Sequence, residues 1–285
     1  MQLLAPAKIN LSFEIRGRRP DGFHEIETLM VPVSLFDRIS LGKISDSNRA
    51  VRFSCNDKSI PTGDDNLVVR AANLFRAATN IDGGLEIGLE KAIPHGAGLG
   101  GGSSDAATTL MGLNELFGGL LHNEDLTRLA AELGSDVPFF LAQSAARCRG
   151  RGEIVEPIAL TRRLRLLLLK PGFGVPTPWA YGRWKDAQEI PGIDYTEQMF
   201  EGMRFVNDLE RPVFEKFIVL AQLKTWLRRQ PDVAVALMSG SGSTVFAVLN
   251  VGADPGAVSM RARKEIDPEL WTCPCESVDR TFDVR

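Results

Sequence analysis

Five glycines lie within the seven residues from Gly96 to Gly102, and two serines follow them directly. Without a Cβ, glycines can adopt backbone conformations in which successive N–H groups point toward one anion. A strand-like segment precedes the glycines and a helix-like segment follows them. The start of that helix would add unpaired N–H donors and the positive end of its dipole. The pattern favours a phosphate-binding loop, with a structural or flexible loop as the alternative.

Two familiar nucleotide-binding motifs do not fit this stretch. The letters contain G-x-G-x-x-G, but a dinucleotide fold needs an acidic residue about 20 residues later, at the end of a second strand. Here the interval holds LMGLNELFGGLLHNED, a helical pattern. No Lys-Ser or Lys-Thr pair follows the glycines, so the P-loop motif is absent. Ser103 or Ser104 is expected to cap the following helix, or to reach a phosphate or Mg²⁺.

A second loop of small residues, SGSGS at 239–243, lies between two apolar strand-like segments. Taken alone, this pattern is typical of a tight hairpin. Two glycine-serine loops in one chain favour a nucleoside triphosphate as ligand, because its oxygens need many hydrogen-bond donors.

The segments around these loops mix antiparallel-looking strands with helices, without a steady alternation. This order favours an α+β architecture over a doubly wound parallel sheet. A division near residue 158 would give two domains, 1–158 and 159–285. Expected strands cover residues 9–15, 26–41, 51–54, 84–94, 147–158, 164–170 and the two flanks of the 239–243 loop. Expected helices cover residues 64–79, 103–118, 123–133 and 177–187, and a long pattern at 211–229 is assigned no element.

The composition is that of an ordinary globular protein. The 285 residues are 44% hydrophobic and 24% charged, with a formal net charge of -3. Such a balance argues against a broad surface for nucleic acid or an anionic membrane. The amino terminus lacks the pattern of an export signal, and the apolar run LRLLLLK is far too short to span a bilayer. We therefore expect a cytoplasmic protein.

The four cysteines, at positions 55, 148, 273 and 275, are scattered along the chain. They do not form a disulfide framework, and no second Cys/His pair accompanies Cys273 and Cys275 to complete a metal site. Reduced structural thiols are the expectation.

Three segments in order resemble the motifs of the GHMP kinases, the family of galactokinase, homoserine kinase, mevalonate kinase and phosphomevalonate kinase. They are APAKINL at 5–11, PHGAGLGGGSSDAA at 94–107 and MSGSGSTVF at 238–246. The resemblance implies a two-domain fold with the active site in the cleft between the domains. It also implies ATP as phosphoryl donor, with Mg²⁺ bridging the phosphates through ligands that the motifs do not name.

The family pattern also implies roles for single residues. Asp136 would accept the proton of the substrate hydroxyl, and Lys8 would be its charged partner, although alone the two would be read as a helix cap and a surface lysine. Asn66 and Lys91 would lie near the nucleotide. The ATP phosphate loop would comprise Pro94, His95, Gly96, Ala97, Gly98, Leu99, Gly100, Gly101, Gly102, Ser103 and Ser104.

Further segments resemble one branch of the family, whose alcohol substrate carries a cytidine diphosphate group and serves isoprenoid precursor synthesis. They are RPDGFH at 19–24, GSDVPF at 134–139 and PTP at 176–178. This likeness places His24 at the edge of the cytosine and Tyr181 stacked on it, with Asn10 and Thr177 near polar groups of the substrate. The branch commonly has Tyr where this chain has Phe23, so a ring survives without its hydroxyl.

Two alternatives stay open. One is a GHMP kinase for another small alcohol, such as homoserine or mevalonate, although such an enzyme has no evident use for His24 among aromatic neighbours. The other is a nucleotide-binding protein without catalysis, against which the intact Lys8 and Asp136 weigh.

Overall fold

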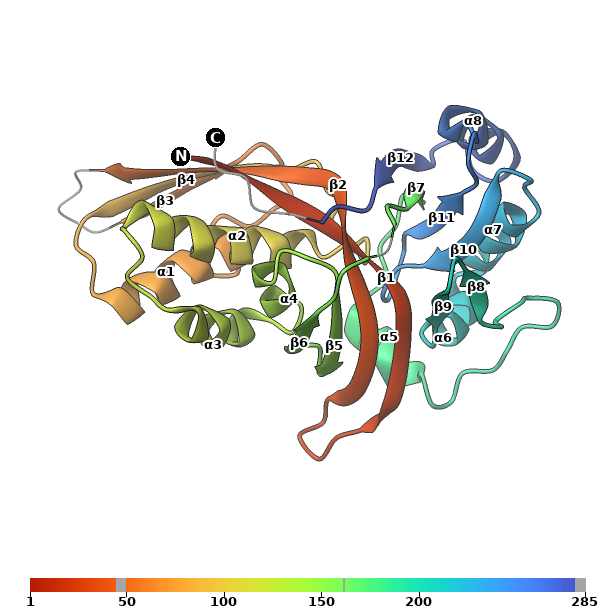
Figure 1. Ribbon diagram of the computed structural model, residues 1–285, viewed down its shortest axis with the longest axis horizontal. Coiled ribbons are helices and arrows are strands. Elements are labelled where there is room, and N and C mark those ends of the chain that lie inside the picture. The colour runs from red at the N-terminus through yellow and green to blue at the C-terminus, as the bar shows by residue number, and fades with distance from the viewer. Residues whose placement is uncertain (45–49, 161, 280–285) are drawn as a thin grey trace.

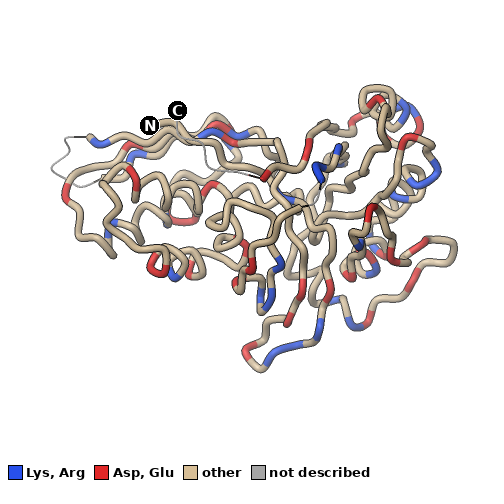
Figure 2. The backbone as a smooth tube through the Cα atoms, viewed as in Figure 1, with Lys and Arg blue, Asp and Glu red and all other residues tan. Residues whose placement is uncertain are grey.

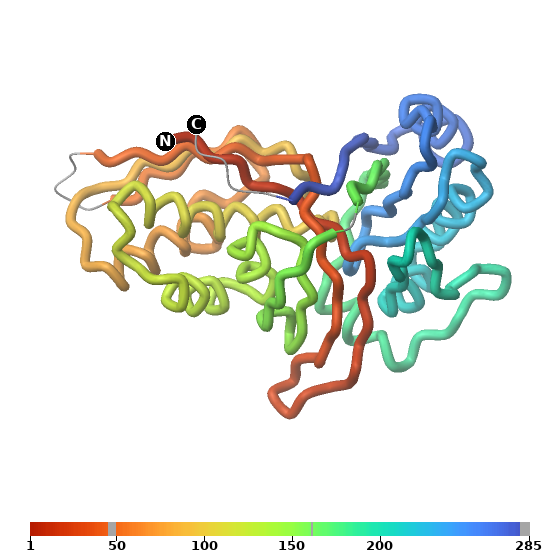
Figure 3. Tube along the Cα trace, in the orientation of Figure 1, coloured from red at the N-terminus to blue at the C-terminus, as the bar shows by residue number. Residues whose placement is uncertain are grey.

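The computed structural model describes residues 1–44, 50–160 and 162–279, which form twelve strands and eight helices in two lobes (Figure 1). The longest elements are β1 (Gln2–Arg18) and β2 (His24–Ile44), an antiparallel hairpin. Figure 3 shows this hairpin leaving one lobe, bending between the two and ending in an exposed turn. One continuous pair of strands therefore runs from the first lobe, through the bend, to the turn.

The larger sheet has eight strands, and its main path runs β3-β4-β2-β1-β9-β8. β5 pairs with β2, and β6 pairs with β5. The pairs are antiparallel except β3 with β4 and β1 with β9. The remaining strands of this sheet are β3 (Val51–Cys55), β4 (Gly84–Glu90), β5 (Ala146–Gly150), β6 (Ile154–Pro157), β8 (Gln198–Phe200) and β9 (Met203–Asn207).

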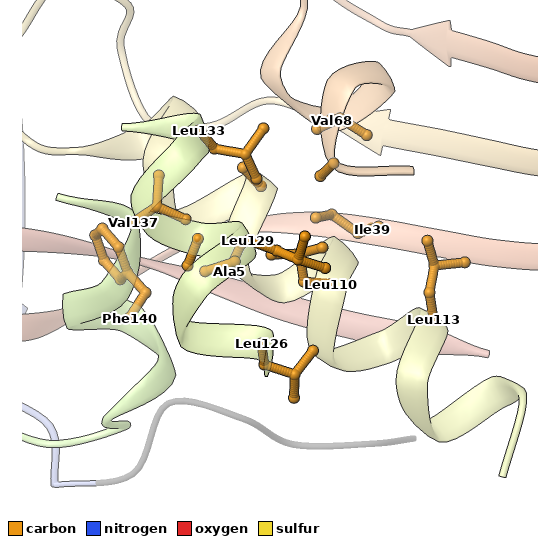
Figure 4. Packing of buried hydrophobic residues seen from close by; sticks show 14 of the residues in the cluster. Ala5, Ile39, Val68, Leu110, Leu113, Leu126, Leu129, Leu133, Val137 and Phe140 are labelled. Carbon is orange, nitrogen blue, oxygen red and sulfur yellow. The ribbon is translucent and has the colours of Figure 1, made fainter. Parts of the chain in front are cut away.

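Four helices pack against the first part of this sheet (Figure 1). They are α1 (Leu67–Thr79), α2 (Gly101–Leu116), α3 (Asn123–Leu133) and α4 (Val137–Leu141). In α3, Leu126, Leu129 and Leu133 recur at helical spacing, and all three are buried. Figure 4 shows them meeting side chains of α1, α2, α4 and the sheet in one apolar core.

The second sheet has the order β10-β11-β7-β12 and is antiparallel throughout. Its strands are β7 (Arg165–Lys170), β10 (Val233–Met238), β11 (Val245–Leu249) and β12 (Trp271–Glu276). Leu166 to Leu169 are all buried, as expected for a strand covered on both faces. The helices of this lobe are α5 (Thr177–Arg183), α6 (Glu210–Lys216), α7 (Ile218–Arg228) and α8 (Pro255–Glu265).

The α+β architecture predicted from the sequence is confirmed. The division expected near residue 158 falls between β6 and β7, and it stays a prediction. Pairing crosses it, because β9 runs parallel to β1. Phe13 and Ile15 of β1 also pack in the core of the second lobe.

One expectation about helices is wrong, and several elements were not predicted. Neither Ser103 nor Ser104 caps α2, since the helix begins at Gly101 and Gly100 precedes it in a left-handed conformation that favours glycine. The long pattern at 211–229 forms two helices, because Phe217 leaves the helical region with φ -113° and ψ 67°. The elements α8, β8, β9 and β12 were not expected.

The four cysteines are free thiols, as predicted. Among the residues that the structure describes, no helix is long and apolar enough to cross a membrane. Basic and acidic residues are interspersed over both lobes (Figure 2).

Candidate active site

A cavity of about 1060 Å³ opens where the two lobes meet the hairpin. Its lining comes from the glycine-rich loop, from β1, from the turn between β1 and β2, from α5 and from the second glycine-serine loop. Of the site residues predicted from the sequence, all but Asn10 and Ser104 are among the lining residues. The fold therefore brings motifs from both halves of the chain to one place.

The glycine-rich loop joins β4 to α2. Gly96, Gly98 and Gly100 have φ values of 62°, 73° and 70°, which other residues adopt only with strain. No side chain caps the first turn of α2. The N–H groups at this helix start are therefore available to an anion, and the helix dipole favours a negative charge there.

The second glycine-serine loop packs directly on the first. Ser239 Oγ donates a hydrogen bond to the carbonyl of Gly98 at 3.0 Å, and the Thr244 N–H donates to the carbonyl of Ala97 at 3.1 Å. A methyl group at Gly98 would lie 2.2 Å from the carbonyl oxygen of Ser239. The contact between the two loops therefore requires glycine at position 98.

Lys8 and Asp136 meet at the wall of the cavity. On β1, Ile9 and Leu11 pack in the core, while Lys8 and Asn10 point to the opposite face, as the two-residue period of a strand dictates. Lys8 Nζ lies 3.5 Å from Asp136 Oδ2 and donates a 2.7 Å hydrogen bond to Asn10 Oδ1. Asp136 precedes α4 without capping it, so its carboxylate remains open to the cavity.

Asn10 is buried and belongs to a chain of hydrogen bonds. Its Nδ2 donates to Thr28 Oγ1 at 2.8 Å, and that hydroxyl donates to the carbonyl of Ser12 at 2.6 Å. With its amide oxygen on Lys8, Asn10 fixes the ammonium group rather than lining the cavity itself.

Lys91 lines the cavity, but its ammonium group is engaged by two acidic side chains. It forms ion pairs with Asp37 and with Asp105, the latter at 2.8 Å. Burial raises the pKa of Asp105 to about 8. The positive charge of Lys91 opposes this rise, and the negative charge of Asp37 adds to it. Burial opposes the charge of Lys91 too, yet the carboxylates of Asp105 and Asp37 leave its pKa raised.

Asn66 and Ser104 are committed to the protein interior. Asn66 caps α1 by accepting from the Val68 N–H at 2.8 Å, and it donates to the carbonyl of Pro61 at 2.7 Å. Ser104 is buried, and its Oγ has no hydrogen-bond partner. Asn66 thus lines the cavity while both polar atoms of its side chain are engaged by the backbone.

His24 and Tyr181 meet, although one ends the first turn and the other lies on α5. Their ring centroids are 5.2 Å apart with an interplanar angle of 35°. Burial, and then the charge of Arg18, lower the pKa of His24. Burial, and then the charge of Asp136, raise the pKa of Tyr181. Both rings are therefore uncharged near neutral pH.

Two residues that sequence reasoning missed enlarge this aromatic corner. Trp184 lies at the end of α5, with its ring 6.0 Å from His24, and the guanidinium of Arg151 lies 4.7 Å from the centre of the Phe23 ring. Thr177, Tyr181 and Trp184 share one helix face, so their spacing could have revealed the tryptophan. No local pattern pointed to Arg151.

Ser241, from the second loop, is a third missed residue. Its hydroxyl lies 2.9 Å from Thr177 Oγ1, so the loop also reaches the start of α5. The SGSGS pattern pointed to this loop in the sequence, but it did not show which of its serines lines the cavity.

Comparisons with known proteins agree with this geometry. Residues 66–144 match the family model described as "GHMP kinases N terminal domain". A "4-diphosphocytidyl-2-C-methyl-D-erythritol kinase" of Methylacidiphilum infernorum (isolate V4) is 46% identical and covers 94% of this chain and 93% of its own length. A chloroplastic protein of the same name from Oryza sativa subsp. japonica is 40% identical over 87% of this chain and 64% of its own length.

Solved structures show the same fold. A crystal structure of "4-(cytidine 5'-diphospho)-2C-methyl-D-erythritol kinase" is 37% identical, covers 98% of this chain and 100% of its own, and has a TM-score of 0.78. A homoserine kinase from Cytophaga hutchinsonii covers 99% of this chain and 95% of its own, with a TM-score of 0.68. At 17% identity, that second likeness concerns the fold alone.

Proposed function

This chain belongs to the 4-diphosphocytidyl-2-C-methyl-D-erythritol kinases of the GHMP kinase family, and we propose that the cavity described above is their active site. The protein is an ATP-dependent kinase. It phosphorylates the 2-hydroxyl of 4-diphosphocytidyl-2-C-methyl-D-erythritol, in the non-mevalonate route to isoprenoid precursors. The observation that carries the assignment is the single cavity that joins a phosphate loop, a Lys–Asp pair and a His–Tyr corner.

The ATP phosphates would lie on the loop 94–104. Supporting this are the left-handed glycines and the uncapped start of α2, which turn backbone N–H groups and a helix dipole toward the cavity. Lys91 lines the same region, and its ammonium group lies close to the start of α2, since a methyl group added at Gly101 would be 3.1 Å from Lys91 Nζ.

Mg²⁺ would enter with ATP and neutralise charge on its phosphates. The ion keeps several waters and needs only one or two carboxylates besides phosphate oxygens. Within the described part of the chain, no three His, Cys, Asp or Glu side chains group as metal ligands. Ser103, in the first turn of α2, lines the cavity and is the side chain that would contact the ion, which leaves Asp136 free to act as the base.

In the transfer step, the substrate hydroxyl oxygen would form a bond to the γ-phosphorus while the bond between that phosphorus and the ADP oxygen breaks. Asp136 would accept the hydroxyl proton, and Lys8 would hold that carboxylate in place and stabilise the transferring oxygens. The buried hydrogen bond to Asn10 holds the ammonium in place for both tasks.

The cytidine would lie at the corner of His24, Tyr181 and Trp184. Aromatic faces offer stacking to the base, and the neutral imidazole offers one donor and one acceptor to its edge. Phe23 and Arg151 would close the outer side of this corner.

The test is ADP release by the purified protein with ATP, Mg²⁺ and a panel of alcohols. We expect turnover with 4-diphosphocytidyl-2-C-methyl-D-erythritol above the ATP-only background, and none with homoserine or mevalonate. Turnover with either of the latter alone would overturn the assignment, and nucleotide binding without turnover would indicate a non-catalytic protein. The expected cytoplasmic location stays a prediction that cell fractionation would check.

A further inference from the structure

Asn207 closes β9 beside the second glycine-serine loop, outside the cavity lining. The side chain is buried, with 5% of its surface exposed. Its Nδ2 donates to the carbonyl of Met238 at 2.7 Å and to the carbonyl of Gly240 at 2.8 Å, while its Oδ1 accepts from the Leu209 N–H at 2.9 Å. Both amide hydrogens are therefore hydrogen-bonded to backbone carbonyls at the start of the loop.

The loop position that Asn207 holds lies against the proposed catalytic groups. A methyl group added at Gly240 would lie 3.3 Å from Asn10 Oδ1 and 3.4 Å from Lys8 Nζ. The Gly240 backbone therefore lies close to the Lys8 ammonium group and to Asn10. A shift of this backbone would change the surroundings of Lys8 directly.

Asn207 is itself tied to the strand that carries Lys8. Phe13 of β1 is its register partner in β9, and the Asp208 N–H donates to the carbonyl of Phe13 at 2.9 Å. Asp208 Oδ2 accepts in turn from the Ile15 N–H at 2.8 Å. One strand, β1, thus carries Lys8 and also fixes the residue that places the loop above it.

The residues after Asn207 reinforce this connection. Glu210 accepts from the Met238 N–H at 2.9 Å and forms a buried ion pair with Lys224, which donates to the carbonyl of Asp194 at 2.9 Å. Met238 is thus held at its N–H by Glu210 and at its carbonyl by Asn207. The entry to the loop is fixed on both sides.

We infer that Asn207 is a positioning residue for phosphoryl transfer: its amide holds Gly240 over Lys8 and thereby keeps the two phosphate-facing loops in register. The inference rests on the proposed kinase function. It concerns the chemical step, because Asn207 contributes nothing to the lining of the cavity. Its loss should lower kcat by a larger factor than it raises the KM values for ATP and the alcohol.

Asn207→Ala tests this, with Asn250→Ala as the matched control. The Asn250 amide also donates to a backbone carbonyl, that of Pro231 at 2.8 Å, at the opposite end of the same hairpin. We expect Asn207→Ala to lower kcat roughly 10- to 100-fold, since small misplacements at a reacting centre cost about that much. Asn250→Ala should keep the parent kcat. Equal kcat values for Asn207→Ala and the parent, or a loss confined to KM, would overturn the inference.

A double-mutant cycle with Ser239→Ala shows whether Asn207 acts through the loop. Ser239 anchors the same loop to Gly98, so the two losses in kcat should be less than additive. Additive losses would overturn the inference. Asn207→Ser supplies a second, polar variant, and failure of both Asn207 variants to fold would assign the residue to folding and overturn it also. All ratios can be measured with whichever alcohol the parent accepts, so failure of the proposed substrate is a separate outcome.

Discussion

Lys8 Nζ faces Asp136 Oδ2 at 3.5 Å, and the two side chains differ sharply in exposure, with 5% and 35% of their surfaces accessible. The cation thus belongs to the rigid interior of β1, where Asn10 orients it, and the carboxylate belongs to the cavity. A substrate hydroxyl can approach Asp136 without displacing Lys8. This difference in exposure suits the two proposed roles. Asp136 must contact a substrate that binds and leaves, whereas Lys8 must stay in one position.

Replacing Asp136 by Asn should lower kcat by about 10²–10⁴-fold, because the amide cannot accept the hydroxyl proton. ATP affinity should stay near that of the parent, since the phosphate loop binds through its backbone. Coupled ADP release and a nucleotide titration measure the two quantities. Asp125→Asn, on the outer face of α3, is the control and should match the parent. Parent-like turnover of Asp136→Asn would refute the role given to this carboxylate.

Replacing Gly98 by Ala should weaken ATP binding, because the new methyl group would meet the Ser239 carbonyl oxygen at 2.2 Å and push the two loops apart. The matched control is Gly118→Ala. Gly118 has a similar φ of 83°, but a methyl group there meets nothing within 4 Å. Both variants therefore carry similar backbone strain, and only the first separates the loops. Equal ATP affinities by calorimetric titration would count against the loop contact.

The glycine-rich loop could be predicted from sequence because its chemistry is local. Close-spaced glycines, a strand before them and a helix after them specify a backbone cradle without knowledge of the rest of the chain. The cap of α2 was predicted wrongly because the prediction used only the general preference for serine at helix starts. Serines are good caps in general, but here Gly100 takes the left-handed conformation and α2 begins before the serines.

The meeting of His24 with Tyr181 could not be predicted from local patterns. It depends on where the tip of a long hairpin bends and on how the second sheet carries α5 toward it. The family resemblance assigned both residues to the cytidine, but it could not show that the two rings meet. Asn207 escaped notice altogether, since an amide that bonds to backbone carbonyls leaves no periodic or compositional trace.

Replacing Tyr181 by Leu should raise KM for the cytidine-bearing substrate roughly 10- to 100-fold, since stacking of one base on one aromatic ring is worth about 1–3 kcal/mol. KM for ATP should not change, because the phosphate loop is untouched. Trp179→Leu is the control: this tryptophan lies on the same helix but packs on Phe217 with a centroid distance of 5.7 Å. Steady-state kinetics with each substrate varied in turn measure both constants. A rise in KM for ATP alone would reverse the assignment of the two ends of the cavity.

Replacing Asp105 by Asn should change how stability depends on pH. The pKa of Asp105 is raised to about 8 in the folded protein, whereas an unfolded chain has a value near 3.9. Between these values the folded state holds a proton on Asp105 that the unfolded state has lost, so the contribution of Asp105 to the free energy of unfolding falls as pH rises from about 4 to about 8. Asparagine resembles the protonated acid and has no proton to lose.

The variant should therefore gain stability relative to the parent as pH rises across that interval, and the difference should level off above it. Denaturant unfolding of both proteins at several pH values measures this difference. Asp125→Asn serves as the surface control and should follow the parent at every pH. A difference between parent and Asp105→Asn that stays constant from pH 5 to pH 8 would show that Asp105 is ionised throughout that interval.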